Sequence, residues 1–411
     1  MAATEKDLAE VRVADLANFQ DGPPLELFGR LRAECPVHWS NGITEYPDEN
    51  GFWSVTTADD VFEVSRDWQT YSSEIGGFTA SNAGVSLELQ QAMFIGMDPP
   101  KHDRLKALFQ RGFTPKRIAE HEGPIRAIAI DVLDRLEGRE HCDLVSEVAQ
   151  PAVSRVIGSF MGLPPEDDEV WARLMNALVS AGDPDVTPEG AQSVMERDVP
   201  EVFERCGRLI AERRQTPTDD LTSVLVHAEL DGERLEDHEI VMGFVLLMAA
   251  GNDSTKATYC SGMRALMENR EQLCMVVADL SLVPAAVEES LRMFPAFGHF
   301  ARTATQDTEL HGQKIKAGEK LVMWYPSSNR DESRYEDPDR FDVTRNPEHQ
   351  AFGAGGRHFC LGTALARLEL RILIEETLER YPGIQVAGTP TFVESPFANQ
   401  LKTLPVRLGG V

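Results

Sequence analysis

Residues 351–363 read AFGAGGRHFCLGT, and this stretch is the most informative in the 411-residue chain. Three glycines precede Cys360, and Gly362 follows it. Glycine lets a backbone turn tightly and lie close to a flat ligand. Cys360 stands where a helix is predicted to begin, and the helix dipole there favours a thiolate. The stretch therefore predicts either a glycine-rich turn that contains a buried cysteine or a loop that binds a ligand through its thiol.

Hydrophobic periodicity predicts a mainly helical protein. The longest helix is expected over residues 237–268, and its middle, residues 241–250, is apolar on every face. Such a pattern is typical of a helix buried inside a large protein. Further helical segments are expected over residues 58–64, over 115–180 with a break at 162–168, from near Pro284 to before Pro295, and over 363–380.

Few segments of the sequence have a pattern that predicts a β-strand. Residues 52–55 predict a strand, followed by a helix that Thr57 caps, and residues 301–325 alternate and turn as a small antiparallel sheet would. Residues 182–190 contain two prolines and two glycines and are expected to join helices. Because no linker or repeat divides the chain, we expect one domain, residues 1–411.

Composition excludes several classes of function. The chain has 40 basic and 67 acidic residues, a net charge of −27, which disfavours binding to nucleic acid or anionic membranes. Its six cysteines are scattered, with no Cys-x-x-Cys pair, so neither a zinc finger nor a disulfide scaffold is predicted. Residues 1–16 lack a secretory signal, and the longest uncharged apolar run, 240–251, is far shorter than the roughly 20 residues that span a bilayer. A cytoplasmic protein without a membrane anchor is expected.

Taken whole, the pattern Phe-Gly-x-Gly-x-x-His-x-Cys-Leu-Gly resembles the haem-binding loop of the cytochrome P450 family. The resemblance implies the cytochrome P450 fold, mainly α with small β-sheets in a triangular prism, with haem b between the long central helix and the cysteine-loop helix. Cys360 would be the proximal iron ligand, with Phe352 and Gly353 beside it. Phe352 stands eight residues before the cysteine, one more than in most bacterial members. That spacing is similar to hydroxylases of methyl-branched lipids and steroid side chains.

The resemblance also implies that four basic residues bind the haem propionates. His102 and Lys106 are four residues apart and share one helix face. Lys106 stands where the family has an arginine. Its ammonium is a point charge, whereas a guanidinium can bind a carboxylate through two N–H groups at once. Arg302 and His358 would complete the set.

A structural element of the family is matched by Glu289 and Arg292, three residues apart on one helix face. Alone, such a pair would usually be exposed to solvent. The resemblance implies instead that the two residues join an arginine of the later meander, here assigned as Arg340, and hold the haem-side core together.

The long helix becomes polar at residues 250–255, AGNDST. One interpretation is that Asp253 marks where the helix emerges into solvent, which Lys256 supports. The resemblance implies instead that Gly251 leaves room for dioxygen over the iron and that Asp253 and Ser254 deliver protons. Ser254 replaces the family's threonine and lacks the methyl group that restricts it, so a less firmly held relay is expected. Thr255 offers a second hydroxyl but faces about 100° away.

The substrate pocket is expected between the 75–94 loop, the long helix and two later segments. Its candidate residues are mostly apolar, which favours a hydrophobic substrate with few polar groups. His299 is the exception, either a contact for a hydroxyl or carboxylate or a histidine of the core. The candidates are Phe78, Met93, Phe94, Leu246, Ala249, Phe297, His299 and Phe397.

These observations predict a haem-thiolate monooxygenase that hydroxylates a lipid, steroid or terpenoid-like molecule with O2. Its two electrons would come from a ferredoxin and ferredoxin reductase. Residues 101–117 hold six basic residues and one acidic residue, a local charge of +5 that would steer an acidic ferredoxin. Two alternatives are a peroxide-driven peroxygenase of the same fold and a non-catalytic haem sensor. The pair Asp253–Ser254 argues against the peroxygenase.

Overall fold

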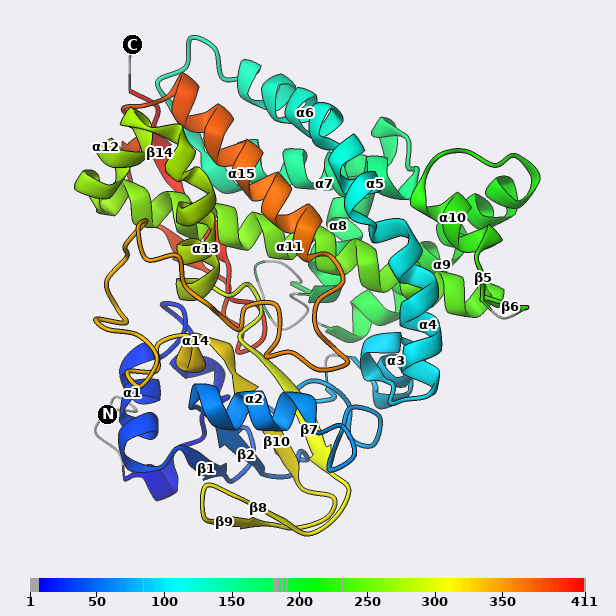
Figure 1. Ribbon diagram of the computed structural model, residues 1–411, viewed down its shortest axis with the longest axis vertical. Helices are drawn as coiled ribbons and strands as arrows, with labels where there is room; N and C mark the ends of the chain where they lie inside the picture. Colours follow the sequence, from blue (N-terminus) through cyan, green and yellow to red (C-terminus); the bar gives the residue numbers. More distant parts are fainter. Residues whose placement is uncertain are drawn as a thin grey trace.

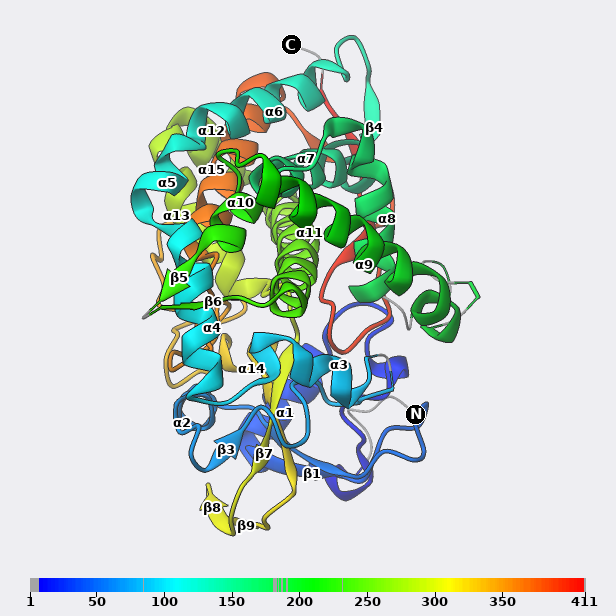
Figure 2. The same ribbon diagram turned by 90° about the vertical axis from the view of Figure 1, so that its right-hand side faces the viewer.

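The helical part of the molecule is built around α11 (Asp237–Glu268), whose bounds are those predicted. The structure is a computed structural model that describes residues 7–409 except 84, 180–182, 184, 186, 187, 190 and 231. Figure 2 looks along α11 and shows other helices around it on several sides. Glu236 and Glu239 form a capping box that satisfies the first N–H groups of the helix. Gly243 lets the helix Lys101–Gln110 (α4) approach, because a Cβ at this glycine would lie 1.9 Å from Cζ of Phe109.

The other helices cover α11 and the sheet (Figure 1). Among the described residues no helix is both long and apolar enough to cross a membrane. The helices other than α11 are α1 (Leu25–Glu34), α2 (Ala58–Arg66), α3 (Leu87–Ala92), α4 (Lys101–Gln110), α5 (Pro115–Glu120), α6 (Glu122–Asp134), α7 (Gln150–Met161), α8 (Asp168–Val179), α9 (Ala191–Gln215), α10 (Leu221–His227), α12 (Arg270–Ala278), α13 (Val283–Met293), α14 (Tyr325–Ser328) and α15 (Thr363–Arg380).

The β-structure forms one main sheet below the helices and several small ones (Figure 1). The main sheet has the order β1-β2-β10-β7-β3, in which only β2 and β10 pair in parallel; its strands are β1 (Val37–Ser40), β2 (Phe52–Val55), β3 (Tyr71–Ser72), β7 (His299–Ala304) and β10 (Lys320–Trp324). The shorter strands are β4 (His141–Asp143), β5 (Glu229–Leu230), β6 (Glu233–Arg234), β8 (Thr308–Leu310), β9 (Gln313–Ile315), β11 (Gln385–Val386), β12 (Thr391–Phe392), β13 (Leu401–Thr403) and β14 (Pro405–Arg407).

The elements that were predicted from local sequence patterns are confirmed. The strand β2, the Thr57 cap of α2, the antiparallel strands between 299 and 324, and helices α13 and α15 all form where expected. The strand β4 was missed inside a segment predicted as helical, because it forms only by pairing with β14 near the other end of the chain. The joining segment 182–190 lies mostly outside the described residues.

A buried ion pair connects α13 to the segment that leads to the cysteine loop. Glu289 and Arg292 have no exposed surface, and their two hydrogen bonds are both 2.8 Å long. The guanidinium of Arg292 also donates to the carbonyls of Asn329 and Pro338. The third charged partner is not Arg340 as expected. Arg345 donates from Nε to Glu289 at 3.2 Å, whereas the Arg340 side chain is 63% exposed and only its carbonyl takes part.

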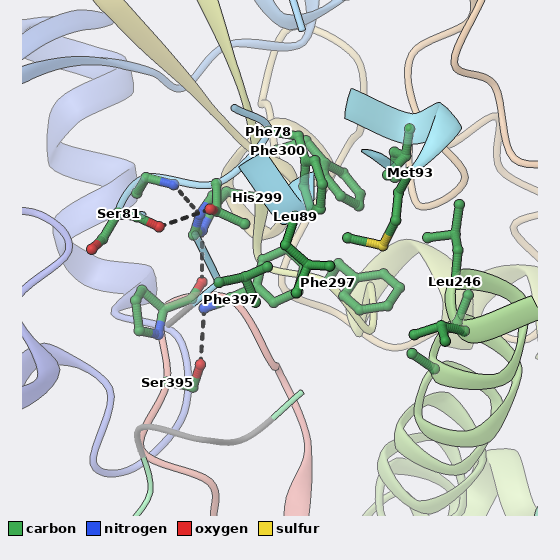
Figure 3. Close-up of a pocket in the computed structure, with 18 of the residues that line it drawn as sticks. Phe78, Ser81, Leu89, Met93, Leu246, Phe297, His299, Phe300, Ser395 and Phe397 are labelled. Atoms are coloured by element: carbon green, nitrogen blue, oxygen red, sulfur yellow. Dashed lines mark hydrogen bonds between the residues drawn. The ribbon is translucent and has the colours of Figure 1, made fainter. Parts of the chain in front are cut away.

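His299 joins the main sheet to two loops that carry apolar side chains (Figure 3). Its Nε2 accepts a hydrogen bond from the N–H of Ala80 at 3.0 Å, and its Nδ1 donates to the carbonyl of Pro396 at 3.0 Å. These partners assign a neutral ring, and complete burial lowers the pKa of His299 to about 4. The prediction of a core histidine therefore fits the structure better than that of a substrate contact.

The Glu289 cluster predicts a graded loss of stability. We expect Arg292→Leu to lower the free energy of unfolding by about 3–5 kcal/mol, because it leaves the buried carboxylate of Glu289 short of its main partner. Arg345→Ala removes the charged hydrogen bond to Glu289 together with those to the carbonyls of residues 336, 337 and 340, and should cost about 1–3 kcal/mol. Urea unfolding measures both, with Arg340→Ala as a control within about 0.5 kcal/mol of the wild type. Equal losses at 340 and 345 would contradict the assignment of Arg345.

His299 predicts a loss of stability in acid. The unfolded ring titrates near 6.5 and the folded ring near 4, so between these values the unfolded state binds the extra proton. The stabilisation is therefore complete above about pH 6.5 and declines as the pH falls to 4, by at most about 3 kcal/mol. Unfolding free energies across this range should fall more steeply for the wild type than for His299→Gln. Parallel curves would show that the ring is not held neutral.

Candidate functional site

Cys360 lies at the end of its glycine-containing loop, just before α15. Gly353, Gly355 and Gly356 all have positive φ, between 78° and 89°, which glycine alone adopts freely. At Gly356 a Cβ would lie 2.7 Å from the carbonyl oxygen of Ser65, so the loop can pack against α2 only with glycine there. The N–H of Cys360 donates to the carbonyl of Phe352 at 2.9 Å, which closes the loop.

The Cys360 thiol faces an internal cavity between α11 and α15. The residue lies deep in the protein, and its accessible surface opens into this cavity. Burial raises the pKa of the thiol, while the N–H of Gly362 and the charges of Lys106 and Arg367 act in the opposite direction. The residues that the sequence placed around the haem all line this cavity: His102, Lys106, Arg302, Phe352, Gly353, His358 and Cys360.

The basic residues gather on one side of the cavity. The rings of His102 and His358 lie 4.3 Å apart between centroids. Arg302 is 4% exposed and donates to the carbonyl of Ala301, and no carboxylate of the described residues forms an ion pair with it. Burial lowers the pKa values of His102, His358 and Arg302, and repulsion by neighbouring cations lowers those of His102 and His358 further. Among the described residues only His102 of this cluster has an acidic partner, Asp103 at 3.0 Å. Arg302 therefore lacks compensating negative charge, and the cluster fits a ligand that carries carboxylates.

Lys106 reaches the cavity but has a further role. Its Nζ donates to the carbonyls of Arg357 and Phe359, the second at 2.7 Å. Lys106 thereby fastens α4 to the loop directly before Cys360, a function that its position in the sequence did not reveal. The pKa of Lys106 is lowered, chiefly by burial.

The hydroxyl-bearing turn of α11 meets the cavity, but Asp253 does not. Gly251, Ser254 and Thr255 line the cavity, and the Ser254 hydroxyl donates to the carbonyl of Ala250 at 2.6 Å. At Gly251 a Cβ would lie only 2.7 Å from Ile157 of α7, so the packing of α7 against α11 also favours glycine at this position.

Asp253 lies on another face of α11 and forms an ion pair with Lys256 at 2.6 Å. Both side chains are buried, so the interpretation that the helix emerges into solvent here is wrong. The Nζ of Lys256 also donates to Gln150 and Asn176, at 2.9 Å each. A buried carboxylate needs such a partner, because unpaired it would cost several kcal/mol.

One acidic residue of the cavity escaped the sequence interpretation. Glu369 of α15 lines the cavity together with Thr255 of α11 and is 3% exposed. Burial raises the pKa of Glu369 to about 8. The signal was present in the sequence, because Glu369 stands four residues from both Leu365 and Leu373 and therefore lies on the apolar face of its helix.

A second, apolar cavity adjoins the first and matches the expected substrate pocket (Figure 3). Its rings pack together, with Phe78–Phe300 at 6.1 Å and Phe297–Phe397 at 5.0 Å between centroids. Leu246 and Phe297 line both cavities and form part of their shared wall. All the expected pocket residues line it (Phe78, Met93, Leu246, Ala249, Phe297, His299 and Phe397) except Phe94, which lines the first cavity.

The sequence also missed the part of this pocket that α9 supplies. Val199, Val202 and Phe203 line the cavity from a helix that gave no motif. Among the described lining residues only Glu394 is charged. The pocket is therefore suited to a hydrophobic molecule and offers no cation to a carboxylate.

The basic stretch 101–117 is less charged at the surface than its composition suggests. Arg104 pairs with Glu233 and Glu239, and Arg117 pairs with Asp219. Lys106 points into the cavity. Part of the +5 charge of this stretch is therefore offset by acidic residues outside it.

Comparison with known proteins identifies the family. Residues 274–383 match the family model described as Cytochrome P450. The chain is 38% identical to the methyl-branched lipid omega-hydroxylase of Mycobacterium tuberculosis over 92% of its own length and 90% of that protein. It is 36% identical to the steroid C26-monooxygenase of the same species, over 92% and 91% of the two chains.

Solved structures agree with this result. Cytochrome P450 CYP268A2 of Mycobacterium marinum, in complex with pseudoionone, superposes with a TM-score of 0.87 at 38% identity and covers 92% of this chain and 93% of its own. CYP108D1 of Novosphingobium aromaticivorans gives 0.86 at 35% identity, with 96% and 97% covered. With relatives this similar along nine-tenths of its length, the chain belongs to the cytochrome P450 family and is a haem-b monooxygenase.

Proposed function

We propose that this protein is a haem-thiolate monooxygenase that uses O2 and two electrons from a ferredoxin to hydroxylate a neutral lipid, steroid or terpenoid-like molecule. The observation that carries the proposal is the joined pair of cavities. One presents a thiol and a cluster of buried bases, and the other is lined almost entirely by apolar side chains. The haem supplies the redox centre at which dioxygen is reduced.

The chain's own residues bind and orient this cofactor. Cys360 provides the iron ligand, and its loop is held by Lys106 and by the packing of Gly356 on α2. His102, Arg302 and His358 bind the propionates, which explains why Arg302 is tolerated in the interior without an acidic partner among the described residues.

The substrate class follows from the second cavity. The relatives are named for lipids and steroids, and one solved neighbour holds pseudoionone. Among the described lining residues the absence of a cation disfavours a substrate whose carboxylate would be buried there. The shared wall at Leu246 and Phe297 brings the apolar molecule next to the haem cavity.

The donor surface is proposed at the cysteine loop. Arg66 of α2 is exposed, and its side chain lies against the loop, 3.8 Å from the position of a Cβ at Gly355. Phe359, 42% exposed, directly precedes Cys360. An acidic ferredoxin would meet positive charge and an aromatic side chain beside the thiol.

The ligand assignment predicts a spectral change. We expect Cys360→Ser to abolish the absorption band that reduced haem gives with CO when a thiolate is its ligand, because serine cannot supply that sulfur. Cys274→Ser, which changes an exposed thiol on α12, should keep the band. Survival of the band in Cys360→Ser would overturn the assignment.

The donor surface predicts a charge effect on electron transfer. Arg66→Glu should slow reduction by a ferredoxin several-fold at low ionic strength and flatten its dependence on salt. Stopped-flow absorbance measures this rate. Lys314→Glu reverses an exposed charge on β9 and should have little effect. A wild-type rate that does not respond to ionic strength would contradict the proposal.

A further inference from the structure

Two loops from distant parts of the chain form walls of the apolar cavity and meet at the start of β7. The first loop is residues 78–81, and the second loop is residues 395–397. Backbone N–H groups at the start of β7 donate to both loops, Ala301 to the first and Gly298 to the second, at 2.7 Å each. The spacing of the two loops is therefore decided at this end of the strand.

His299 connects the two loops through its imidazole ring (Figure 3). The N–H of Ala80 in the first loop can only donate, so Nε2 of His299 accepts from it at 3.0 Å. The carbonyl of Pro396 in the second loop can only accept, so Nδ1 carries the ring hydrogen and donates at 3.0 Å. A protonated ring has two donors and would lose its bond to Ala80. The connection thus requires the neutral imidazole.

The surroundings of His299 hold the ring in this arrangement. Its side chain is 1% exposed and contacts the rings of Trp324 and Phe397 edge to face, at 4.9 and 5.4 Å between centroids. Burial, and to a smaller extent the charge of Lys320, lower the pKa of His299. The ring cannot turn over or gain a proton without breaking its hydrogen bond to one of the loops.

The first loop is also fastened to the sheet and to α3. Nζ of Lys320, on β10, donates to the carbonyls of Thr79 and Ala80 at 3.0 and 3.3 Å. Oε1 of Gln90, on α3, accepts from the N–H of Phe78 at 2.8 Å. These contacts fix the path of the first loop, and the imidazole then fixes the second loop relative to it.

The loops carry aromatic side chains that reach the wall shared with the haem cavity. Phe78 of the first loop packs against Phe300 at 6.1 Å between centroids. Phe397 of the second loop packs against Phe297 and Phe300, at 5.0 and 5.6 Å. Phe297 and Phe300 line both cavities. A change in the spacing of the loops would therefore displace rings next to the haem cavity.

We propose that His299 is a positioning residue that sets the spacing of the two loops and thereby selects, by shape, the neutral apolar molecules that the cavity accepts. The proposal rests on the proposed function, because it concerns the same substrate cavity. Both hydrogen bonds of the ring exist before a ligand arrives, so the walls are preorganised. A molecule that matches them loses little binding free energy in ordering the loops.

The first experiment tests the connection without a ligand. His299→Leu keeps a side chain of similar volume and removes both hydrogen bonds, so the amide hydrogen of Ala80 in the holoenzyme should exchange faster than in the wild type. His299→Gln, which offers a donor and an acceptor, should restore part of the protection. His38→Leu changes another buried histidine of the same sheet, which lines neither cavity, and should leave exchange at Ala80 unchanged. Equal exchange at Ala80 in wild type and His299→Leu would overturn the proposal.

The second experiment measures shape selection from the shift of the haem absorption band when an imidazole nitrogen binds the iron. Imidazole fits the haem cavity alone, whereas N-dodecylimidazole and clotrimazole extend into the apolar cavity with a flexible chain and with a bulky group of aromatic rings. In His299→Leu the affinity for clotrimazole should fall about tenfold, because its rings no longer match the displaced walls, and the affinity for N-dodecylimidazole much less, because its chain adapts.

The affinity for imidazole serves as the internal control and should stay close to that of the wild type in His299→Leu. His299→Gln should recover part of the wild-type ratio between the affinities for the two larger azoles, and His38→Leu should keep that ratio. The same ratio in wild type and His299→Leu would overturn the role of His299 in selecting the substrate.

The two proposals fail in different ways. A wild type that binds imidazole but neither larger azole would have no usable cavity beside the haem, which would overturn the proposed function and the role of His299 with it. A wild type that binds all three azoles, with a selectivity that His299→Leu does not change, would overturn only the role of His299.

Discussion

The ion pair between Glu289 and Arg292 holds α13 to the chain that leads to Cys360, and the haem side of the molecule depends on it. Neither residue has exposed surface, so each charge must be compensated inside the protein. Arg345 supplies a second cation, and backbone carbonyls accept the remaining guanidinium hydrogens. The segment after α14 has little regular secondary structure. These polar contacts, more than a hydrogen-bonded ladder, therefore fix its path to the cysteine loop.

The need to compensate a buried charge also distinguishes charges that stabilise the fold from charges that bind a ligand. The Glu289 cluster is compensated within the protein, and so is the pair Asp253–Lys256. Arg302 is equally buried but has no acidic partner among the described residues. A buried cation tolerated in this way indicates that a bound ligand supplies the opposite charge. The lack of internal compensation, rather than the presence of charge, marks the side of the cavity where we propose that the propionates bind.

Local sequence patterns predicted most of the fold and much of the site. The bounds of α11 and α15 follow from periodicity within each segment, and the cysteine loop follows from its own motif. Contacts between distant segments were not predictable in the same way. The pairing of β4 with β14, the choice of Arg345 over Arg340, and the pocket wall from α9 all depend on chain paths that no local pattern encodes.

The acids beside the hydroxyl-bearing turn of α11 are a case in which helical periodicity held more information than the motif. The α11 residues that line the cavity are spaced three or four apart, at 250–251, 254–255 and 258, whereas Asp253 falls between these pairs. On α15 the lining positions 365–366 and 369–370 follow the same spacing and include Glu369. Two helices that face one cavity must each present one stripe to it. An acid on the stripe shares the low-dielectric space with the cofactor, while an acid one position away is buried against other helices and requires its own cation.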